Sequence, residues 1–422
     1  MKKIALILIL VISFSSCDKN KKNTFSTIDE NQKILDSLTV DLDSIQKNGP
    51  IIGFAVAMVN QNGVLYEKGF GLANLDTKEK YTENTIQHIA SVSKTLIGVA
   101  LMKAKEMGKL NLDDPIQDYL PFKVIHPNYP NETITIRQLA THTSGINDTY
   151  EQYMERAWIL TKNQNLINVS IDYPEQRLNP SELNIPMEKY LKEYLELNGL
   201  YYQDDNYINF KPGERYNYSN IGATLCALVI EKATGQAFDS FTEEHILKPL
   251  GMNSSGWSLD DVDIKKHSRL YRNDNTLLPF YTAITYPDGM LISSSSDMAR
   301  YLVELINGYS GKGTLLSKES YKELFTKQLS DNNFAEGERN ADHPYDGDYN
   351  PGIFIGYSAF GFVGHSGGDA GVATWMYFDK EKKTGRYIVI NCDMGNDKRA
   401  RELEYYAIWD KMNDYFDRLI VD

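Results

Sequence analysis

A serine and a lysine three residues apart are the strongest sign of chemistry in this sequence. Ser91 and Lys94 stand at the head of IASVSKTLIGVALM, a segment that is apolar on nearly every face and is predicted to be helical. Residues three apart share one face of a helix, so the hydroxyl and the amine can meet. Because burial lowers the pKa of a lysine from about 10.4, Lys94 can become the base that takes the proton of Ser91.

The Ser-x-x-Lys spacing also occurs elsewhere and has a plain structural explanation. One copy, at Ser16, spans a predicted signal cleavage point, and another, at Ser44, lies on a solvated helix face that cannot lower a lysine pKa. Ser91 itself could be only the N-cap of its helix, since serine caps helices well. We take Ser91 as the predicted nucleophile because it alone heads an apolar helix.

A second serine motif has the spacing of a nucleophile elbow. Ser366 stands in GHSGGDAG, and an elbow of this Gly-x-Ser-x-Gly type needs a helix after the serine and a histidine later in the chain. The following VATWMYFDK is β-branched and aromatic, which predicts a strand, and the last histidine of the chain is His365. Ser366 is therefore not expected to be the nucleophile.

The segment RYNYSN could supply two further polar groups, Tyr218 and Asn220. A phenol opposite the serine could share its proton with Lys94, and an amide could position a substrate. The same Tyr-x-Asn spacing occurs at three other tyrosines: Tyr129, Tyr207 and Tyr271. Only Tyr218 follows a Pro-Gly turn and leads into an apolar helix, although a plain aromatic loop would explain any of the four.

These motifs must be positioned by strands from both ends of the chain and by helices from its middle. Residues 28–47 carry apolar side chains at helical spacing, and two strands flank the turn NQNG soon after them. Strands return near the end, before a closing amphipathic helix. The predicted fold is α+β: a discontinuous sheet domain, residues 29–90 and 280–422, interrupted by a mainly helical domain, residues 91–279, with the active site in the cleft between them.

The first residues predict export. Residues 1–16 have two lysines, an apolar run too short for a comfortable membrane span, and small residues before Cys17. This arrangement resembles a bacterial lipoprotein signal, so we expect Cys17 to be lipidated and residues 17–28 to form a tether. An ordinary cleaved signal with an incidental cysteine is the alternative.

Composition argues against several other classes of protein. Only Cys226 and Cys392 remain beyond Cys17, so no disulfide framework is expected and a large apolar core must hold the fold. The net charge of −13 argues against nucleic acid and anionic membranes as partners. Histidines at metal-ligand spacing are absent from the sequence, so neither a metal site nor another cofactor is predicted.

The order of serine, lysine, tyrosine and asparagine resembles the penicillin-recognising serine hydrolases, closest to the class C β-lactamase branch with its DD-peptidases and esterases. The resemblance runs from the region of residue 50 to the end and includes YEKGFGLANL, LATHTSGI and KPGERYNYSN. It implies a β-lactamase/transpeptidase-like fold, an antiparallel sheet flanked by helices. It also implies that Ser91 attacks a carbonyl, that Lys94 and Tyr218 shuttle its proton, and that water releases the acyl group.

That family closes its site with Lys-Thr-Gly, His-Ser-Gly or His-Thr-Gly on the strand that lines the cleft. The chain contains a literal Lys383-Thr384-Gly385, but it lies in a charged turn with only one strand and the last helix after it. His365-Ser366-Gly367 has two strands and the helix after it, as the resemblance requires. Its residues are therefore predicted to face substrate, and the amides of Ser91 and Gly368 to form the oxyanion hole.

The resemblance leaves the substrate open among a small ester, a D-amino acid peptide or amide, and a β-lactam, with a peptidoglycan-derived peptide as one case. A catalytically silent protein that binds penicillin or muropeptide is the alternative. Family β-lactamases of this branch usually carry lysine in place of His365, whose reference pKa of about 6.5 leaves it mostly uncharged at neutral pH. We therefore expect slow β-lactam turnover. Residues 146–210 are expected either to overhang the cleft or to form a peripheral helical decoration.

Overall fold

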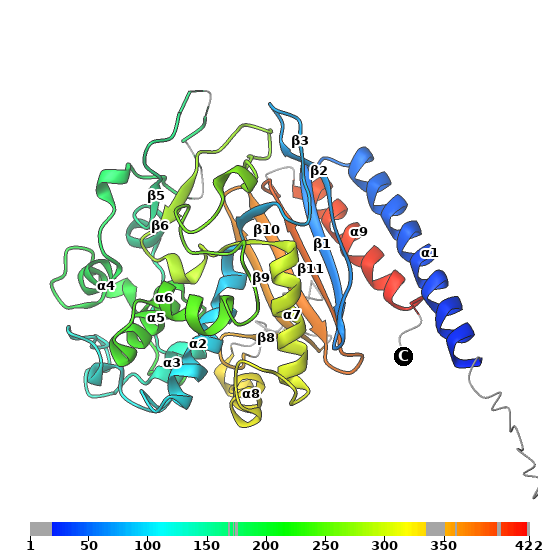
Figure 1. Cartoon of the computed structure of the whole chain (residues 1–422). Coiled ribbons are helices and arrows are strands. Elements are labelled where there is room, and N and C mark those ends of the chain that lie inside the picture. The colour runs from blue at the N-terminus through cyan, green and yellow to red at the C-terminus, as the bar shows by residue number, and fades with distance from the viewer. Residues whose placement is uncertain are drawn as a thin grey trace, which may run out of the picture.

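A seven-stranded antiparallel sheet forms the centre of the computed structural model, which describes residues 19–167, 169–171, 173, 176–334, 351–358, 361–394 and 398–419 (Figure 1). The strand order is β3-β2-β1-β11-β10-β9-β8. In chain order the strands are β1 (Gly53–Asn60), β2 (Gly63–Asn74), β3 (Glu79–Lys80), β8 (Gly356–Tyr357), β9 (Phe362–Asp369), β10 (Val372–Asp379) and β11 (Thr384–Ile390). The predicted signal, residues 1–16, and Cys17 lie outside the described residues.

The two ends of the chain meet in the middle of this sheet. β1 pairs with β2 on one side and with β11 on the other, where Phe54 lies opposite Ile390. Successive side chains of β1 enter two different cores: Phe54 and Val56 pack on one face of the sheet, and Ala55 and Ala57 pack on the other. A strand covered on both faces is a continuous apolar run. The prediction of an α+β fold built on a helix-flanked antiparallel sheet is confirmed.

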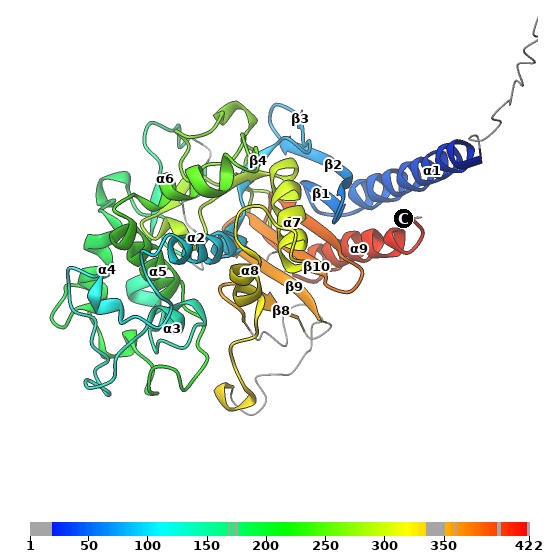
Figure 2. The same ribbon diagram turned by 60° about the horizontal axis from the view of Figure 1, so that its bottom comes forward.

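Helices cover both faces of the sheet. α1 (Lys19–Asn48) and α9 (Lys398–Phe416) lie side by side on one face, where Leu38, Leu42 and Trp409 are fully buried (Figures 1 and 2). α7 (Ser295–Tyr309) packs on the other face. A Cβ on Gly385 of β11 would lie 2.8 Å from the Leu302 side chain, so the glycine lets α7 approach the sheet closely.

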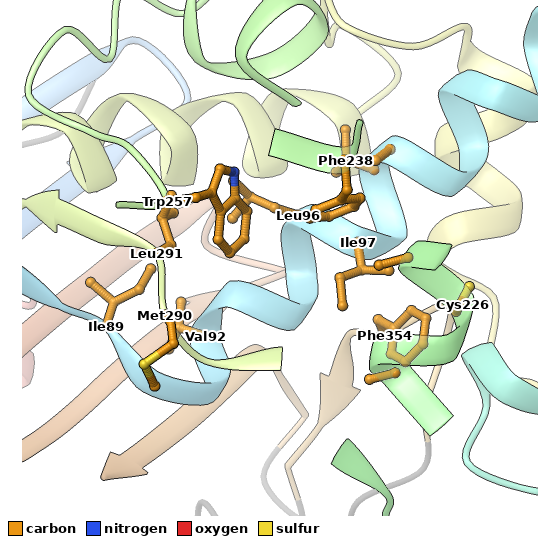
Figure 3. Packing of buried hydrophobic residues seen from close by; sticks show 14 of the residues in the cluster. Ile89, Val92, Leu96, Ile97, Cys226, Phe238, Trp257, Met290, Leu291 and Phe354 are labelled. Atoms are coloured by element: carbon orange, nitrogen blue, oxygen red, sulfur yellow. The ribbon is translucent and has the colours of Figure 1, made fainter. Parts of the chain in front are cut away.

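The helix that follows the predicted nucleophile lies at the centre of the helical region. α2 (Lys94–Glu106) is buried continuously from Lys94 to Met102. Figure 3 shows Leu96 and Ile97 of this helix packed among Phe238, Trp257 and Phe354. Each large apolar side chain buried in this way stabilises the fold by about 1.5–3 kcal/mol. Such packing on all sides fixes the start of α2, where the candidate chemistry lies.

The remaining elements surround α2 and connect it to the sheet. The helices are α3 (Ile136–Ala140), α4 (Met187–Leu195), α5 (Asn220–Thr234), α6 (Phe238–Thr242) and α8 (Lys318–Phe325). Two small antiparallel sheets pair β4 (Ile86–His88) with β7 (Ile292–Ser294), and β5 (Trp158–Leu160) with β6 (Tyr281–Ala283). The β5–β6 pair connects the stretch 146–210 with the segment that follows α6 in the chain.

Two segments differ from their predicted form. α1 begins at Lys19, so most of the segment predicted as a tether, residues 17–28, is helical. The residues KNKKNTFST contain neither glycine nor proline, so nothing breaks the helix between them and the apolar part of α1. The stretch 146–210 contains one α-helix, the nine-residue α4, together with β5 and several turns.

Candidate active site

Ser91 and Lys94 meet where a 3₁₀ turn, η1 (Ala90–Ser93), runs into α2. The Lys94 Nζ donates hydrogen bonds to the Ser91 Oγ at 3.0 Å and to the backbone carbonyl of Asp288 at 2.6 Å. The N-cap positions of η1 and α2 are Ile89 and Ser93, so the alternative of Ser91 as a simple cap is wrong. The hydroxyl is instead held against an amine.

Lys94 lies in an environment that favours its neutral form. Its side chain is completely buried, and burial lowers its pKa to about 8, against the opposing attraction of three carboxylates: Asp288, Asp148 and Asp369. A group with this pKa is neutral in a useful fraction of molecules just above neutral pH. Lys94 can therefore accept a proton from Ser91 in the position that it already occupies.

Asp288, which sequence reasoning missed, fixes the position of the Lys94 amine. Its backbone carbonyl anchors the amine, and its buried carboxyl accepts hydrogen bonds from Tyr153 Oη at 3.2 Å and Thr224 Oγ1 at 3.1 Å. Burial raises the pKa of this carboxyl to about 7, although Lys94 opposes the shift. Asp288 stands in the short segment YPDG, which has no periodic pattern from which this role could be predicted.

Tyr218 faces the same pair from the segment before α5. Its ring centroid is 5.1 Å from Lys94 Nζ, and its hydroxyl oxygen is buried without a hydrogen bond of ordinary geometry to the described residues. Burial raises the pKa of Tyr218 well above its usual value, although the nearby Ser91 hydroxyl favours the ionised phenol. The phenol is therefore protonated and can donate, which leaves Lys94 as the candidate base.

Asn220 is the first residue of α5, and its position is fixed by Asp148. The Asp148 carboxylate accepts the backbone N–H groups of Asn220 at 2.6 Å and Ile221 at 3.1 Å, and the Ser219 hydroxyl at 2.8 Å. A carboxylate that receives the first N–H groups of a helix stabilises its N-terminus. Asn220 also lines the cavity described below, as expected of a residue that would position substrate.

Strand β9 carries the predicted wall residues His365, Ser366, Gly367 and Gly368. A Cβ on Gly367 would lie 2.9 Å from the backbone of both Ile89 and Ser91, so β9 passes directly against the turn that bears the serine. β9 continues through a tight turn into β10, with Ser366 opposite Trp375. Strand β10, and not a helix, comes directly after the segment of Ser366, in agreement with its rejection as an elbow nucleophile.

The rival Lys383-Thr384-Gly385 lies elsewhere in the sheet. Lys383 is in the turn between β10 and β11, and Thr384 and Gly385 begin β11, opposite Asn60 and Val59 of β1. None of the three lines the cavity that contains Ser91, and of β9 only Gly368 and Asp369 line it, not His365, Ser366 or Gly367. Gly367, however, lies directly against the backbone of Ser91. The His365-Ser366-Gly367 segment is therefore the one that the structure brings to the serine.

His365 is more strongly neutral than its reference pKa predicts. Its side chain is only 4% exposed, and burial together with the charge of Lys94 lowers its pKa to about 4. The ring Nδ1 pairs with the backbone carbonyl of Ser366. The reference pKa of about 6.5 would make His365 titrate in mildly acidic solution, whereas the lowered pKa keeps it neutral there as well as at neutral pH.

A cavity of about 400 Å³ opens onto these groups. Ser91, Asn220, Asp288 and Gly368 line it, and residues from the stretch 146–210 complete it: Tyr153, Met154, Trp158, Tyr173 and Gln176. Part of this stretch therefore walls the cavity, while α4 lies among the helices around α2. Two of these residues hold Asp369, whose carboxylate accepts the Gln176 amide at 3.0 Å and the Trp158 indole N–H at 3.2 Å.

Within the described residues, no group of three or more histidines, cysteines, aspartates and glutamates is arranged to hold a metal ion. Among the helices of the described part of the chain, none combines the length and apolar character needed to cross a membrane. Cys226 and Cys392 are both buried and unbridged.

The sheet, the inserted helices and the Ser91–Lys94 pair have the arrangement that the resemblance to the penicillin-recognising serine hydrolases implied. The chain belongs to the Beta-lactamase family, whose sequence profile matches residues 41–408. The resemblance seen in the motifs is thereby confirmed over most of the chain.

Individual relatives agree with this assignment. Protein flp of Staphylococcus aureus (strain MW2) is 27% identical over 323 residues, which is 76% of this chain and 55% of flp, so the chain spans little more than half of that relative. The octameric penicillin-binding protein homologue from Pyrococcus abyssi is 26% identical, with a TM-score of 0.63 over 85% of this chain and 72% of that one. The D-amino acid amidase from Ochrobactrum anthropi SV3 shares the fold, with a TM-score of 0.64 at 17% identity over 90% of this chain and 99% of that one.

Proposed function

We propose that the protein is an exported serine hydrolase that acts through an acyl-enzyme on Ser91. The observation that carries this proposal is the 3.0 Å hydrogen bond between Ser91 Oγ and a buried Lys94 whose pKa is lowered to about 8. A serine needs such a base to become a nucleophile near neutral pH. A catalytically silent binding protein would have no use for an amine kept partly unprotonated at this position.

The proposed reaction begins when Ser91 Oγ bonds to a substrate carbonyl carbon while Lys94 accepts the hydroxyl proton. The backbone amides of Ser91 and Gly368 stabilise the resulting oxyanion. Collapse of the tetrahedral intermediate breaks the bond to the leaving group, which receives a proton through Tyr218. Water then attacks the acyl-enzyme, releases the acid and restores the proton to Ser91.

The charges of the cavity favour an ester or a D-amino acid peptide over a β-lactam. Three lining residues are acidic, Asp288, Asp369 and Asp393, and Arg272 is the one basic residue among those lining the cavity in the described part of the chain. His365 is neutral and does not line the cavity, so Arg272 is the lining cation of the described residues that could attract the carboxylate of a penicillin. The D-amino acid amidase that shares this fold is known in complex with D-phenylalanine, which supports a small amino acid derivative as substrate.

Intact mass spectrometry tests the proposal directly. The protein is incubated with a fluorophosphonate and then separately with esters, D-alanyl peptides and a penicillin. A single adduct on Ser91 and turnover of an ester or peptide are expected. Absence of any covalent adduct would favour the silent binding protein instead.

Replacing His365 by lysine tests the proposed selectivity. The kcat/KM for penicillin, relative to that for an uncharged ester, should rise about tenfold or more in His365→Lys, because a charge-assisted hydrogen bond to a carboxylate contributes about 1.5–3 kcal/mol. The uncharged ester measured on the same variant is the control for damage to the site. Rapid penicillin turnover by the wild type that His365→Lys leaves unimproved would contradict this role.

Export and lipidation are proposed from the sequence that precedes the folded part. Cys17 follows an apolar signal and stands two residues before α1. Its lipidation would attach the protein to a membrane facing the periplasm or the cell surface, with α1 as the link. The N-terminal end of α1 points away from the helical region that holds the site (Figure 2).

The Cys17→Ala variant tests the lipid anchor. The wild type should incorporate radiolabelled fatty acid and sediment with membranes, whereas Cys17→Ala should do neither. Activity on a soluble ester should be the same in both, because Cys17 lies far along the chain from the catalytic groups. A wild-type protein that is exported, unlabelled and fully soluble would contradict the proposal.

A further inference from the structure

One buried histidine contacts the segment that carries Tyr218 at three places. His142, in the loop THTSGIN, is 1% exposed, and its backbone carbonyl accepts the Asn217 N–H at 2.7 Å. Its ring Nδ1 accepts the Ser219 N–H at 3.2 Å. Its ring also lies on that of Tyr218, with centroids 4.5 Å apart and planes inclined by 30°. The residues immediately before and after the phenol are therefore both held by His142.

The chemical form of His142 is fixed by these contacts. An Nδ1 that accepts a backbone N–H carries no proton, so the ring is the neutral tautomer with its proton on Nε2. Burial lowers the pKa of His142 well below its usual value, and the charge of Lys94 adds to the effect. Nε2 is buried without a hydrogen-bond partner among the described residues. A neutral ring is required, because protonation at Nδ1 would remove the bond to Ser219.

The backbone at His142 is unfavourable for most side chains. Its φ is +56°, in the left-handed region, which residues other than glycine adopt uncommonly, although asparagine, aspartate and histidine do so several-fold more often than the rest. Phe354 and Tyr216 both lie edge-on to the ring, with centroids 5.4 Å and 6.0 Å from it. A buried N–H without a hydrogen-bond partner among the described residues does not itself stabilise the loop. Of the three aromatic rings around His142, that of Tyr218 is the nearest.

We propose that His142 is a positioning residue, which holds the Tyr218 phenol in place beside Ser91 and Lys94 for proton transfer. The inference rests on the proposed acyl-enzyme function, because it assigns His142 a role through the catalytic phenol. Displacement of a reacting group by about 1 Å can reduce a rate about a hundredfold. Loss of the ring should therefore slow the reaction at Ser91 without abolishing substrate binding.

The test compares His142 variants by the rate of Ser91 labelling with a fluorophosphonate, followed by intact mass spectrometry. His142→Leu should lower the rate about ten- to a hundredfold. His142→Asn should recover most of it, because asparagine tolerates a positive φ and its side-chain oxygen can accept the Ser219 N–H. With an ester substrate, kcat should fall while KM changes little.

A second background separates positioning from general damage. When Tyr218→Phe already lacks the hydroxyl, His142→Leu should change the labelling rate by less than about twofold, since the two changes act on one step. The matched control is His126→Leu. His126 is also buried, with Nδ1 accepting the Asn128 N–H at 3.3 Å and Nε2 bonded to the Ile208 carbonyl at 2.8 Å, but it packs on Tyr129 and Tyr207 instead.

Several results would overturn the role of His142 as a positioning residue. Equal losses from His142→Leu in the wild-type and Tyr218→Phe backgrounds, or an equal loss from His126→Leu, would overturn the proposal. If His142→Leu does not fold, His142→Gly adopts the positive φ readily and removes the ring, and wild-type labelling by that variant would overturn it as well. A wild type that is not labelled at Ser91 refutes the proposed function itself, whereas normal labelling with unaffected His142 variants refutes only this inference.

Discussion

Ser91→Ala should abolish covalent labelling and lower ester or peptide turnover by about four orders of magnitude or more, as expected when the nucleophile of an acyl-enzyme mechanism is removed. The reason is the geometry of the pair: no other described serine is paired with a fully buried lysine, and Lys94 has no second hydroxyl within hydrogen-bond distance among the described residues. Labelling by a fluorophosphonate, read as the intact mass of the protein, measures the effect. The folded fraction is checked by thermal unfolding.

Two serine variants are the controls for this result. Ser44 has the same Ser-x-x-Lys spacing, but Lys47 is exposed and ion-paired with Asp43, so Ser44→Ala should be labelled like the wild type. Ser366 lies in β9 next to Gly367, which contacts the backbone of Ser91, and Ser366→Ala should still be labelled measurably. Labelling that persists in Ser91→Ala would refute the mechanism and return Ser366 to consideration.

The placement of Ser91 beside a buried lysine was predictable because it depends on short, periodic signals. A helix that is apolar on every face is predicted to be buried, and a lysine in its first turn is then buried too, which lowers its pKa. The burial of Lys94 at the start of α2 confirms this prediction. The pairing of β1 with β11 was predictable for a similar reason, since strands at the two ends of the chain had no other sheet to join. In both cases the residues carry the information locally.

The groups that tune the site could not be predicted in this way. Asp288 holds Lys94 across 194 residues of sequence, and His142 holds Tyr218 from a loop without a repeating pattern. Such contacts depend on where two loops meet, and that depends on the packing of every element between them. The helical form of residues 19–28 was missed for the opposite reason, because a polar segment carries no hydrophobic pattern even where it continues a helix.

Removal of the lysine amine is expected to have the second largest effect. Lys94→Ala, and likewise Lys94→Met, which keeps most of the volume, should each lower kcat by about two or more orders of magnitude, the usual contribution of a positioned base. Tyr218→Phe should act similarly through loss of the proton donor. Lys94→Met is the better test of chemistry, because it leaves no cavity in the packed start of α2.

The pH dependence distinguishes a base from a structural amine. Lys94 must be neutral to accept the Ser91 proton, and burial sets its pKa near 8, so the wild-type kcat/KM should rise as pH increases through about 8 and then level off. This rise should vanish in Lys94→Met, whose small residual activity has no such base. His365, with a pKa of about 4, cannot produce a rise in kcat/KM in this pH range, and neither can Tyr218, whose pKa lies far above it.

The Asp288→Asn variant should move this rise to lower pH. The Asp288 carboxyl has a pKa of about 7, and its negative charge favours the protonated Lys94 amine, so its removal lowers the pKa of Lys94. A rise in kcat/KM that persists unchanged in Lys94→Met, or a Lys94→Met protein that does not fold, would make the lysine a structural residue and leave Ser91 without its base.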